Sequence, residues 1–205
     1  MRSFSGRNQM LATGLAGLAG FVDATGFIAT GGFFLSFMSG NSTRLGVGLA
    51  GPIGNAALAG GLIAAFVGGV MAGTLTGRLA GPWHRPVVLL FLGLLLAAAA
   101  GLCGAGLYWA GFLVTAAAMG AENTVFEADG DVRISLTYMT GNLVKTGQRL
   151  AGILLGRGRW EWLPFFALWS AMVGGAVAGA ALWPVLGMDG LWLAAAAAIG
   201  LAGAS

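Results

Sequence analysis

Charged side chains are scarce in this sequence. Asp, Glu, Lys and Arg together make up 8% of the 205 residues, whereas hydrophobic residues make up 58%, and the mean hydropathy is +0.86. Soluble domains carry roughly 25% charged residues. The shortage of charge therefore excludes a soluble domain and predicts an all-α protein that crosses a lipid bilayer several times.

Cysteine and histidine are nearly absent as well. The single Cys103 lies in an apolar run, so no intrachain disulfide can form, and His84, the one histidine, is expected in a loop with no metal-ligand partners. The sequence contains no phosphate-binding loop, no nucleophile elbow and no His-Glu-x-x-His motif. We therefore expect no enzyme activity, no metal and no cofactor.

The ten Lys and Arg residues outnumber the seven Asp and Glu residues, but they are spread over many loops. Scattered cations of this kind reflect the orientation of membrane segments rather than a nucleic-acid surface. No long linker or separate soluble domain interrupts the apolar sequence. We expect a single membrane domain that comprises residues 1–205.

A polar motif occurs twice in this apolar background. Residues 35–51 and residues 136–152 are identical at 8 of 17 positions. Both copies contain Met-Ser/Thr-Gly-Asn, followed three residues after the Asn by Arg or Lys. A duplicated motif of this length predicts that the chain consists of two related halves, residues 8–108 and residues 109–205.

A second repeat supports the same division. Residues 65–73 and residues 171–179 match at six of nine positions, and each copy contains Gly-x-x-x-Gly. Small residues at this spacing let helices approach one another closely in lipid. Such faces predict close helix pairs, and they are also compatible with a homodimer.

Spanning helices need about 20 largely apolar residues. The motif segments 33–51 and 134–156 are long enough, but each carries polar residues and glycines in its middle. The other candidates, of which the last is shorter, are residues 8–30, 52–77, 86–109, 110–126, 162–188 and 190–205.

Two topologies follow, depending on the motif segments. If each segment is broken or re-entrant, each half has three spanning helices and the halves are inverted repeats. If each segment spans, the protein has eight spanning segments and parallel repeats. We prefer the inverted model with a cytoplasmic N-terminus, because it leaves only Arg44 near the far side. The cations that it places on the cytoplasmic side are Arg2, Arg7, Arg78, Arg85, Arg133, Lys145, Arg149, Arg157 and Arg159.

The motif residues are the first candidates for a binding site. Glycine weakens a helix, and Asn, Ser and Thr can bond the backbone groups that a break exposes. Many secondary transporters build their substrate site from broken helices that meet near the bilayer midplane. We predict substrate contacts from Ser39, Gly40, Asn41, Thr140, Gly141 and Asn142. The alternative is that the glycines permit close packing and the two Asn residues bond across the bundle.

Two carboxylates precede the motifs within spanning segments. Asp23 and Glu122 each lie within about a dozen residues of their motif. A carboxylate inside a bilayer is costly unless it is neutralised or paired. One interpretation is that they exchange protons and couple transport to a proton gradient. The other is that they form ion pairs with Arg44 and Lys145.

Arg44 and Lys145 occupy the same place in the two motif copies. If they line a cavity, the substrate is an anion; if they lie at helix ends, they are anchors at the membrane surface. The aromatic residues near the motifs offer a lining for a planar or apolar ligand, and they are Phe33, Phe34, Phe37 and Tyr138.

Four motifs in linked order resemble those of the YoaK family of bacterial inner-membrane proteins. The resemblance extends over nearly the whole chain, and it implies a bacterial cytoplasmic membrane, about six spanning segments and small-molecule transport, but no particular substrate. The family usually has Gly-Ala-Gln-Asn where this chain has Gly120-Ala121-Glu122-Asn123, so Glu122 departs from the family's pattern. The motifs are Gly20-Phe21-Val22-Asp23-Ala24-Thr25-Gly26-Phe27, Met38-Ser39-Gly40-Asn41, Met119-Gly120-Ala121-Glu122-Asn123 and Tyr138-Met139-Thr140-Gly141-Asn142.

The sequence thus predicts a secondary transporter that moves a small metabolite, anionic if the cations line its path, by alternating access. Its expected partners are the lipid bilayer and that substrate, with no nucleic acid. Two other functions remain open. One is a channel with the paired motifs as its filter, and the other is a non-transporting scaffold whose small-residue faces bind other helices.

Overall fold

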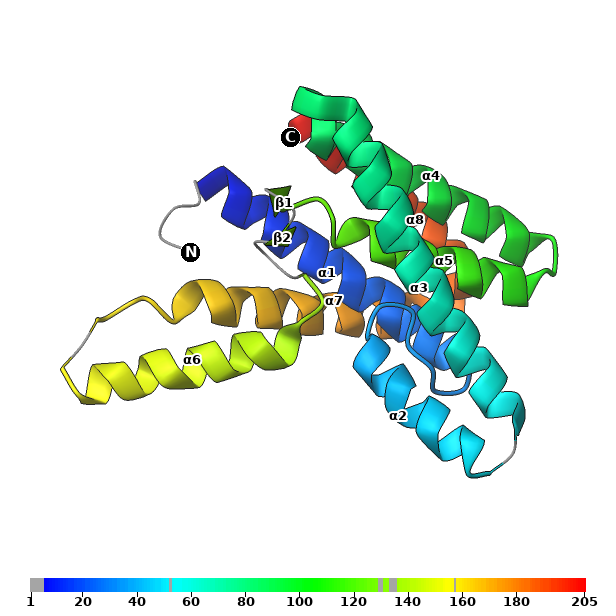
Figure 1. The fold of residues 1–205 in the computed structure, drawn as a ribbon, viewed down its shortest axis with the longest axis horizontal. Helices are drawn as coiled ribbons and strands as arrows, with labels where there is room; N and C mark the ends of the chain where they lie inside the picture. Colours follow the sequence, from blue (N-terminus) through cyan, green and yellow to red (C-terminus); the bar gives the residue numbers. More distant parts are fainter. Residues whose placement is uncertain (1–5, 52, 129–130, 133–135, 157) are drawn as a thin grey trace.

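The computed structural model describes residues 6–51, 53–128, 131–132, 136–156 and 158–205, and they are almost entirely helical (Figure 1). The all-α prediction is therefore confirmed. The helices are α1 (Gly6–Ala29), α2 (Met38–Leu49), α3 (Ile53–Ala80), α4 (His84–Gly104), α5 (Tyr108–Glu122), α6 (Met139–Leu154), α7 (Leu163–Leu186) and α8 (Gly190–Ala204). Short 3-10 helices, η1 (Gly81–Trp83) and η2 (Gly187–Asp189), join α3 to α4 and α7 to α8. A two-residue antiparallel pair, β1 (Glu127–Ala128) and β2 (Asp131–Val132), follows α5.

The predicted apolar segments all form helices, and one of the differences from the predicted bounds lies between α4 and α5. The segment predicted at 86–109 ends at Gly104, because the chain turns at Gly106, where φ is +81°. The backbone N–H of Leu107 donates to the carbonyl of Leu102 at 2.9 Å and closes the turn. A positive φ of this kind favours glycine, which explains the position of the turn.

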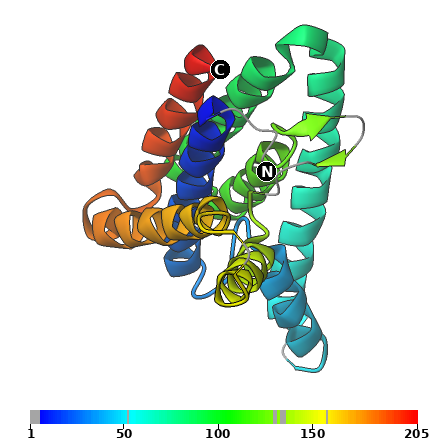
Figure 2. The same cartoon turned by 90° about the vertical axis from the view of Figure 1, so that its left-hand side faces the viewer.

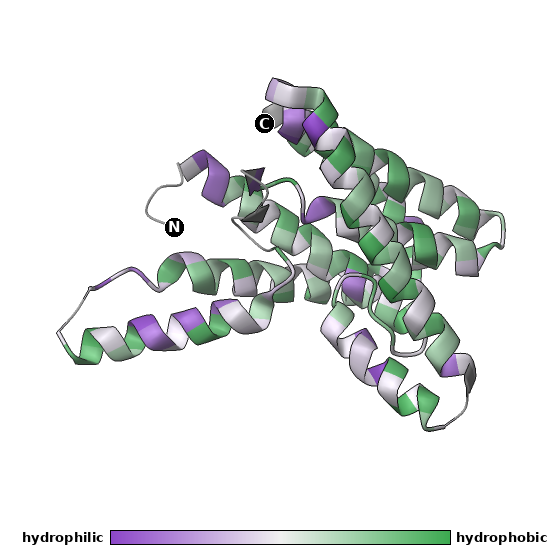
Figure 3. Ribbon diagram, in the orientation of Figure 1, coloured by the Kyte–Doolittle hydropathy of each residue, from purple (hydrophilic) through white to green (hydrophobic). Residues whose placement is uncertain are grey.

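Three helical segments are long and apolar enough to cross a membrane: Gly6–Ala29, Gly54–Gly104 and Leu163–Gly203. The second and third each contain two helices joined by a 3-10 turn. At 1.5 Å per residue, α1 is about 36 Å long, compared with about 30 Å for the hydrocarbon core of a bilayer. These lengths agree with the predicted membrane protein, and Figure 3 shows mainly hydrophobic helices, with hydrophilic residues on α6 and near several helix ends.

Each motif segment contains one short helix. Each helix begins at the Met of its motif, after a stretch of non-helical chain. With 12 residues in α2 and 16 in α6, they are about 18 Å and 24 Å long, shorter than α1, α3, α4 and α7. Figure 1 shows α2 and α6 pointing away from the middle of the molecule in opposite directions, and in Figure 2 the α6–α7 hairpin points toward the viewer.

The Gly-x-x-x-Gly helices pack against helices of the other half of the chain. α3 lies along α5, and α7 lies along α1. A Cβ atom on Gly69 would collide with the backbone carbonyl of Ala117, and a Cβ atom on Gly175 with that of Gly17. The predicted close-packing faces are therefore used within the chain.

Glycines on the partner helices α5 and α1 make the same close contacts with α3 and α7. A Cβ atom on Gly120 of α5 would collide with the carbonyl of Phe66, and one on Gly20 of α1 with the carbonyl of Met172. Phe66 and Met172 are equivalent positions of the second repeat, 106 residues apart. The two helix pairs thus touch at matching positions.

Two ends of the helical bundle can be defined by their contacts. At the polar end, the Arg85 guanidinium donates to Asn8 at 2.8 Å, Arg7 donates to the carbonyl of Ser205 at 3.2 Å, and Arg78 pairs with Glu127. At the opposite end, a hollow of about 650 Å³ is lined by the last residues of α1, α4 and α7 together with Tyr108 and residues 187–189.

Candidate functional site

Asp23 of α1 ties down the first motif loop. Its side chain is 5% exposed. Carboxylate oxygen Oδ1 accepts the backbone N–H groups of Leu35 (2.8 Å) and Ser36 (2.6 Å), and Oδ2 accepts the Ser36 hydroxyl (2.6 Å). Because the chain around Leu35 and Ser36 is not helical, these donors need partners at this depth, and Asp23 supplies them.

Asn41 performs the same task for the next peptide group. It is completely buried. Its Oδ1 accepts the N–H of Phe34 at 3.0 Å, and its Nδ2 donates to the carbonyl of Phe34 at 2.6 Å. Both side-chain polar atoms of Asn41 are thus engaged with backbone groups of the non-helical chain before α2.

In the second half, Asn123 and Thr137 take the places of Asp23 and Ser36. The Thr137 hydroxyl donates to Asn123 Oδ1 at 3.2 Å. Asn123 follows Asp23 by 100 residues, the same interval that separates Gly20 from Gly120. Pairing Asp23 with Glu122 from the sequence was therefore one residue out of register, and the interval between the glycines was the signal that could have corrected it.

Glu122 is a second buried carboxyl group in the middle of the molecule. Its side chain has no exposed surface, and neither carboxylate oxygen has a hydrogen-bond partner among the described residues. Burying an unpaired polar group is costly, so this position is unusual for a purely structural residue.

The ion pairs considered for the two carboxylates do not form in the described part of the chain. The Arg44 guanidinium lies over the rings of Phe27 (5.9 Å) and Phe33 (5.0 Å), and the Lys145 ammonium lies 5.4 Å from the centre of the Phe165 ring. Both cations are therefore held by aromatic faces.

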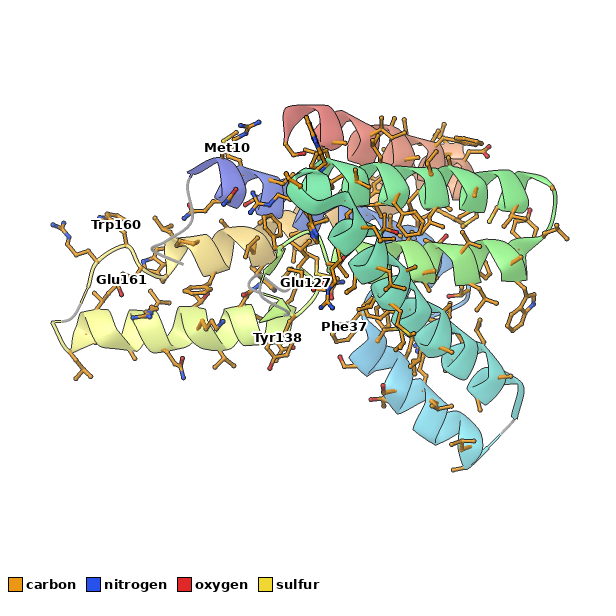
Figure 4. The ribbon with its side chains drawn as sticks, turned by 45° about the horizontal axis from the view of Figure 1, so that its top comes forward. Met10, Phe37, Glu127, Tyr138, Trp160 and Glu161 are labelled. Atoms are coloured by element: carbon orange, nitrogen blue, oxygen red, sulfur yellow. The ribbon has the colours of Figure 1, made fainter. Side chains whose placement is uncertain are left out.

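The glycines of the two motifs seat aromatic rings. A Cβ atom on Gly40 would stand 2.8 Å from ring atoms of Phe34 and Phe37, and one on Gly141 would collide with the ring of Tyr138. Phe37 and Tyr138, both labelled in Figure 4, immediately precede α2 and α6. The neighbouring Ser39 and Thr140 are exposed, and Asn142 is buried with its Nδ2 3.6 Å from the Met139 sulfur.

The two motifs meet at a groove of about 690 Å³ between α1, α7, the first motif loop and the start of α6. Asp23 and Thr140 are its polar lining residues. The described lining includes no Lys or Arg. Its aromatic lining consists of Phe27, Phe34, Phe37 and Trp169.

Of the ten predicted site residues, Asp23 and Thr140 line this groove. The other eight are not among its lining residues: Ser39, Gly40, Asn41, Arg44, Glu122, Gly141, Asn142 and Lys145. Gly40 and Arg44 line a separate hollow of about 470 Å³ beside α2, and Lys145 is exposed. Trp169 was not expected in the site, because an aromatic residue in an apolar helix carries no mark of the face that it lies on. No group of three or more His, Cys, Asp or Glu side chains that could hold a metal occurs in the described segments.

Comparison with known proteins assigns the chain to a protein family. Residues 11–204 match the family model described as "Protein of unknown function (DUF1275)". The chain belongs to this family. Over 195 residues it is also 36% identical to the UPF0700 transmembrane protein RA0705 of Rhizobium meliloti (strain 1021), an alignment that covers 95% of this chain and 84% of the relative. No solved structure matches it. The expected membership of a YoaK-like membrane family is confirmed.

Proposed function

We propose that this protein is a secondary transporter that binds a small solute in the groove between α1, α7 and the two motifs. The observation that carries the proposal is the meeting of the two motif segments at this groove of about 690 Å³. Ligand pockets of drug-sized molecules have volumes of about 300–1,000 Å³, mostly apolar linings and a few polar groups. The groove has this character.

The direction of the helices supports an inverted repeat. α1 and α4 begin at the polar end, whereas α3, α5 and α8 finish there or immediately before the groups that lie there. α7 finishes at the opposite end, where α5 and α8 begin. The first, third and fourth helices of one half thus run opposite to their counterparts in the other. This is the arrangement in which alternating access is built around a fixed central site.

The distribution of cations supports a cytoplasmic polar end. Arg7, Arg78 and Arg85 make their contacts there, and Arg149 and Arg159 line a hollow with Gln9 near the start of α1. Lys and Arg gather on the cytoplasmic side of membrane proteins, so we place this end in the cytoplasm of a bacterial inner membrane. Arg2, Arg133 and Arg157 lie outside the described residues.

The groove favours a solute with an apolar or planar part. Four aromatic rings line it, while Arg44 and Lys145 are held against other rings outside it. An anion would need a cation or several N–H donors in the site. We therefore propose an aromatic or apolar metabolite rather than a simple anion.

Asp23 and Glu122 are the proposed proton-coupling residues. Asp23 is both part of the groove lining and the acceptor for the Leu35 and Ser36 donors. Protonation of Asp23 would weaken these hydrogen bonds and release the first motif loop. Proton binding would thereby be coupled to a conformational change at the site. The Glu122 oxygens have no hydrogen-bond partner among the described residues, so this group can hold a proton without breaking a bond there.

The test is a thermal-shift screen of the purified protein against small metabolites, with aromatic and apolar compounds beside organic anions. A ligand that binds only the folded state raises the melting temperature. Ala176→Trp fills the groove and is expected to abolish the shift. Leu182→Trp, on the same helix but outside the groove lining, is the matched control and is expected to preserve it.

A stabilising compound is then tested in proteoliposomes. We expect it to accumulate against its own gradient when a pH gradient is imposed. A compound that only equilibrates would indicate a channel instead, and stabilisation that Ala176→Trp leaves intact would show that the groove is not the site.

A further inference from the structure

A polar cluster, in which Glu127 is largely covered and Arg78 is exposed, joins the two halves at the polar end. The Glu127 side chain is 8% exposed. Its Oε1 accepts hydrogen bonds from Arg78 Nη2 (2.9 Å) and Nε (3.2 Å), and its Oε2 accepts the Thr74 hydroxyl (2.9 Å). Because Thr74 and Arg78 belong to α3 and Glu127 to β1, the cluster links the end of one half's Gly-x-x-x-Gly helix to the segment that follows α5.

A second bond reinforces the same junction. His84, the first residue of α4, lies with its Nε2 2.9 Å from the carbonyl oxygen of Thr124. A Cβ atom on Gly77 would collide with the His84 ring, so α3 and the start of α4 are in close contact. The polar end of the α3–α5 pair is thus held by bonds from both α3 and α4.

The repeat shows what the other half has in the same places. With the interval of 106 residues, Thr74 corresponds to Ala180, and with the interval of 100 residues, Glu127 corresponds to Phe27. Ala180 and Phe27 both line the groove of about 690 Å³. Where one half has an open groove, the other has a hydrogen-bonded polar cluster.

The third member of the cluster is also without an equivalent. Arg78 corresponds to Pro184, inside α7, which has neither a charge nor a backbone N–H to donate. The end of the α1–α7 pair therefore lacks a counterpart of this polar link, and both the groove and the hollow of about 650 Å³ lie along it.

We propose that Thr74, Arg78 and Glu127 form a latch that keeps the polar end closed while the groove is accessible from the opposite end. When the latch opens, an equivalent groove forms along α3, lined by residues that correspond to those of the present groove. Val67 and Met71 stand in for Val173 and Val177, and Tyr138 for Phe37. This inference rests on the proposed alternating-access function and assigns the residues that select between its two states.

The test is hydrogen–deuterium exchange, followed by mass spectrometry, on the full-length protein in lipid nanodiscs. Glu127→Gln keeps the shape of the side chain and removes its charge. If the latch selects between two states, exchange rises at residues 74–80 and 123–128 and falls at residues 24–32 and 180–189. Losing hydrogen bonds to a charged group should change these rates by about tenfold.

Two further variants provide a second test of the latch and a control. Thr74→Val removes one bond of the latch, is milder, and is expected to shift exchange in the same two directions. Glu161→Gln is the matched control, because the Arg149–Glu161 ion pair has the same 2.9 Å distance and joins α6 to the connection before α7, away from the latch (Glu161 is labelled in Figure 4). It is expected to leave both ends unchanged.

Exchange that rises only at the polar end, or that does not change, would overturn the latch and leave the cluster as a local ion pair. The result is independent of transport. A transporter without reciprocal exchange would refute the latch alone, whereas reciprocal exchange without accumulation in proteoliposomes would refute the proposed transport.

Discussion

The close packing of the Gly-x-x-x-Gly helices α3 and α7 on helices of the other half can be tested by adding single methyl groups. Gly69→Ala in α3 and Gly175→Ala in α7 each place a Cβ atom against the backbone of a helix from the other half. At Gly69 the new atom would stand 2.6 Å from Ala117 Cα, and at Gly175 it would stand 2.7 Å from the carbonyl carbon of Gly17. Ordinary contacts of this kind lie between 3.4 and 4 Å.

The helices must therefore separate by roughly 1 Å at the substituted position, because a backbone cannot rotate away as a side chain does. A gap of this size forfeits about a quarter to a half of the dispersion energy of each affected contact. Overpacking of a tight interface costs about 1–3 kcal/mol. In a protein of this size the melting temperature should fall by roughly 3–10 °C.

The chain offers its own controls, since each critical glycine follows another one. Gly68 and Gly174 have no atoms within 4 Å of an added Cβ, so Gly68→Ala and Gly174→Ala should leave stability unchanged or raise it slightly. Differential scanning fluorimetry of tryptophan emission in detergent measures all four variants under one condition.

The comparison is designed so that the reasoning can fail. If Gly69→Ala melts at the same temperature as Gly68→Ala, the two helices are not in backbone contact. If Gly69→Ala is destabilised and Gly175→Ala is not, the matching of the two helix pairs is wrong, and with it the equivalence on which the groove and the latch were compared.

Three further outcomes are expected. Asp23→Ala leaves three hydrogen-bond donors unpaired, at a cost of about 1–3 kcal/mol per donor, whereas Ser36→Ala leaves no backbone donor unpaired. We expect Asp23→Ala to lower the melting temperature more, and equal decreases in the two variants would contradict the role of the carboxylate. Glu122→Met removes a carboxyl group that has no hydrogen-bond partner among the described residues and should raise the melting temperature by a few degrees; a decrease would reveal a partner for that group. Burial raises the pKa of Glu127, but hydrogen bonds from Arg78 and Thr74 and the charges of Arg78 and His84 outweigh burial, so the pKa lies below its ordinary value. Its stabilising contribution is therefore complete above the ordinary glutamate pKa and is lost as the pH falls through the lowered value; in melting curves against pH, the wild type should lose its advantage over Glu127→Gln on acidification, and a constant difference would contradict the ion pair.

Much of the helical architecture could be predicted from local sequence. Long apolar runs gave the spanning segments, and Gly-Asn within an apolar segment marked the breaks before α2 and α6, because backbone freedom and side-chain hydrogen bonding are properties of single residues and their neighbours. The Gly-x-x-x-Gly spacing likewise identified the helices that approach others most closely.

The partners of these features could not be predicted in the same way. Asp23 bonds to Leu35 and Ser36 instead of Arg44, and Asn123 rather than Glu122 takes its equivalent position. Local pattern did not reveal either, since the first depends on how the loop folds back on α1 and the second on helix register.

The sequence by itself determined that this is a helical membrane protein with duplicated motifs, because hydropathy and duplication are properties of the order of the residues. Only the tertiary structure decided that each Gly-x-x-x-Gly helix packs on the other half, that the cations lie on aromatic rings outside the groove, and that Trp169 and Phe27 line it. In a soluble helix a polar face separates core from surface. In a membrane, the faces toward lipid and toward protein are both apolar, so the one-dimensional pattern does not say which residues meet.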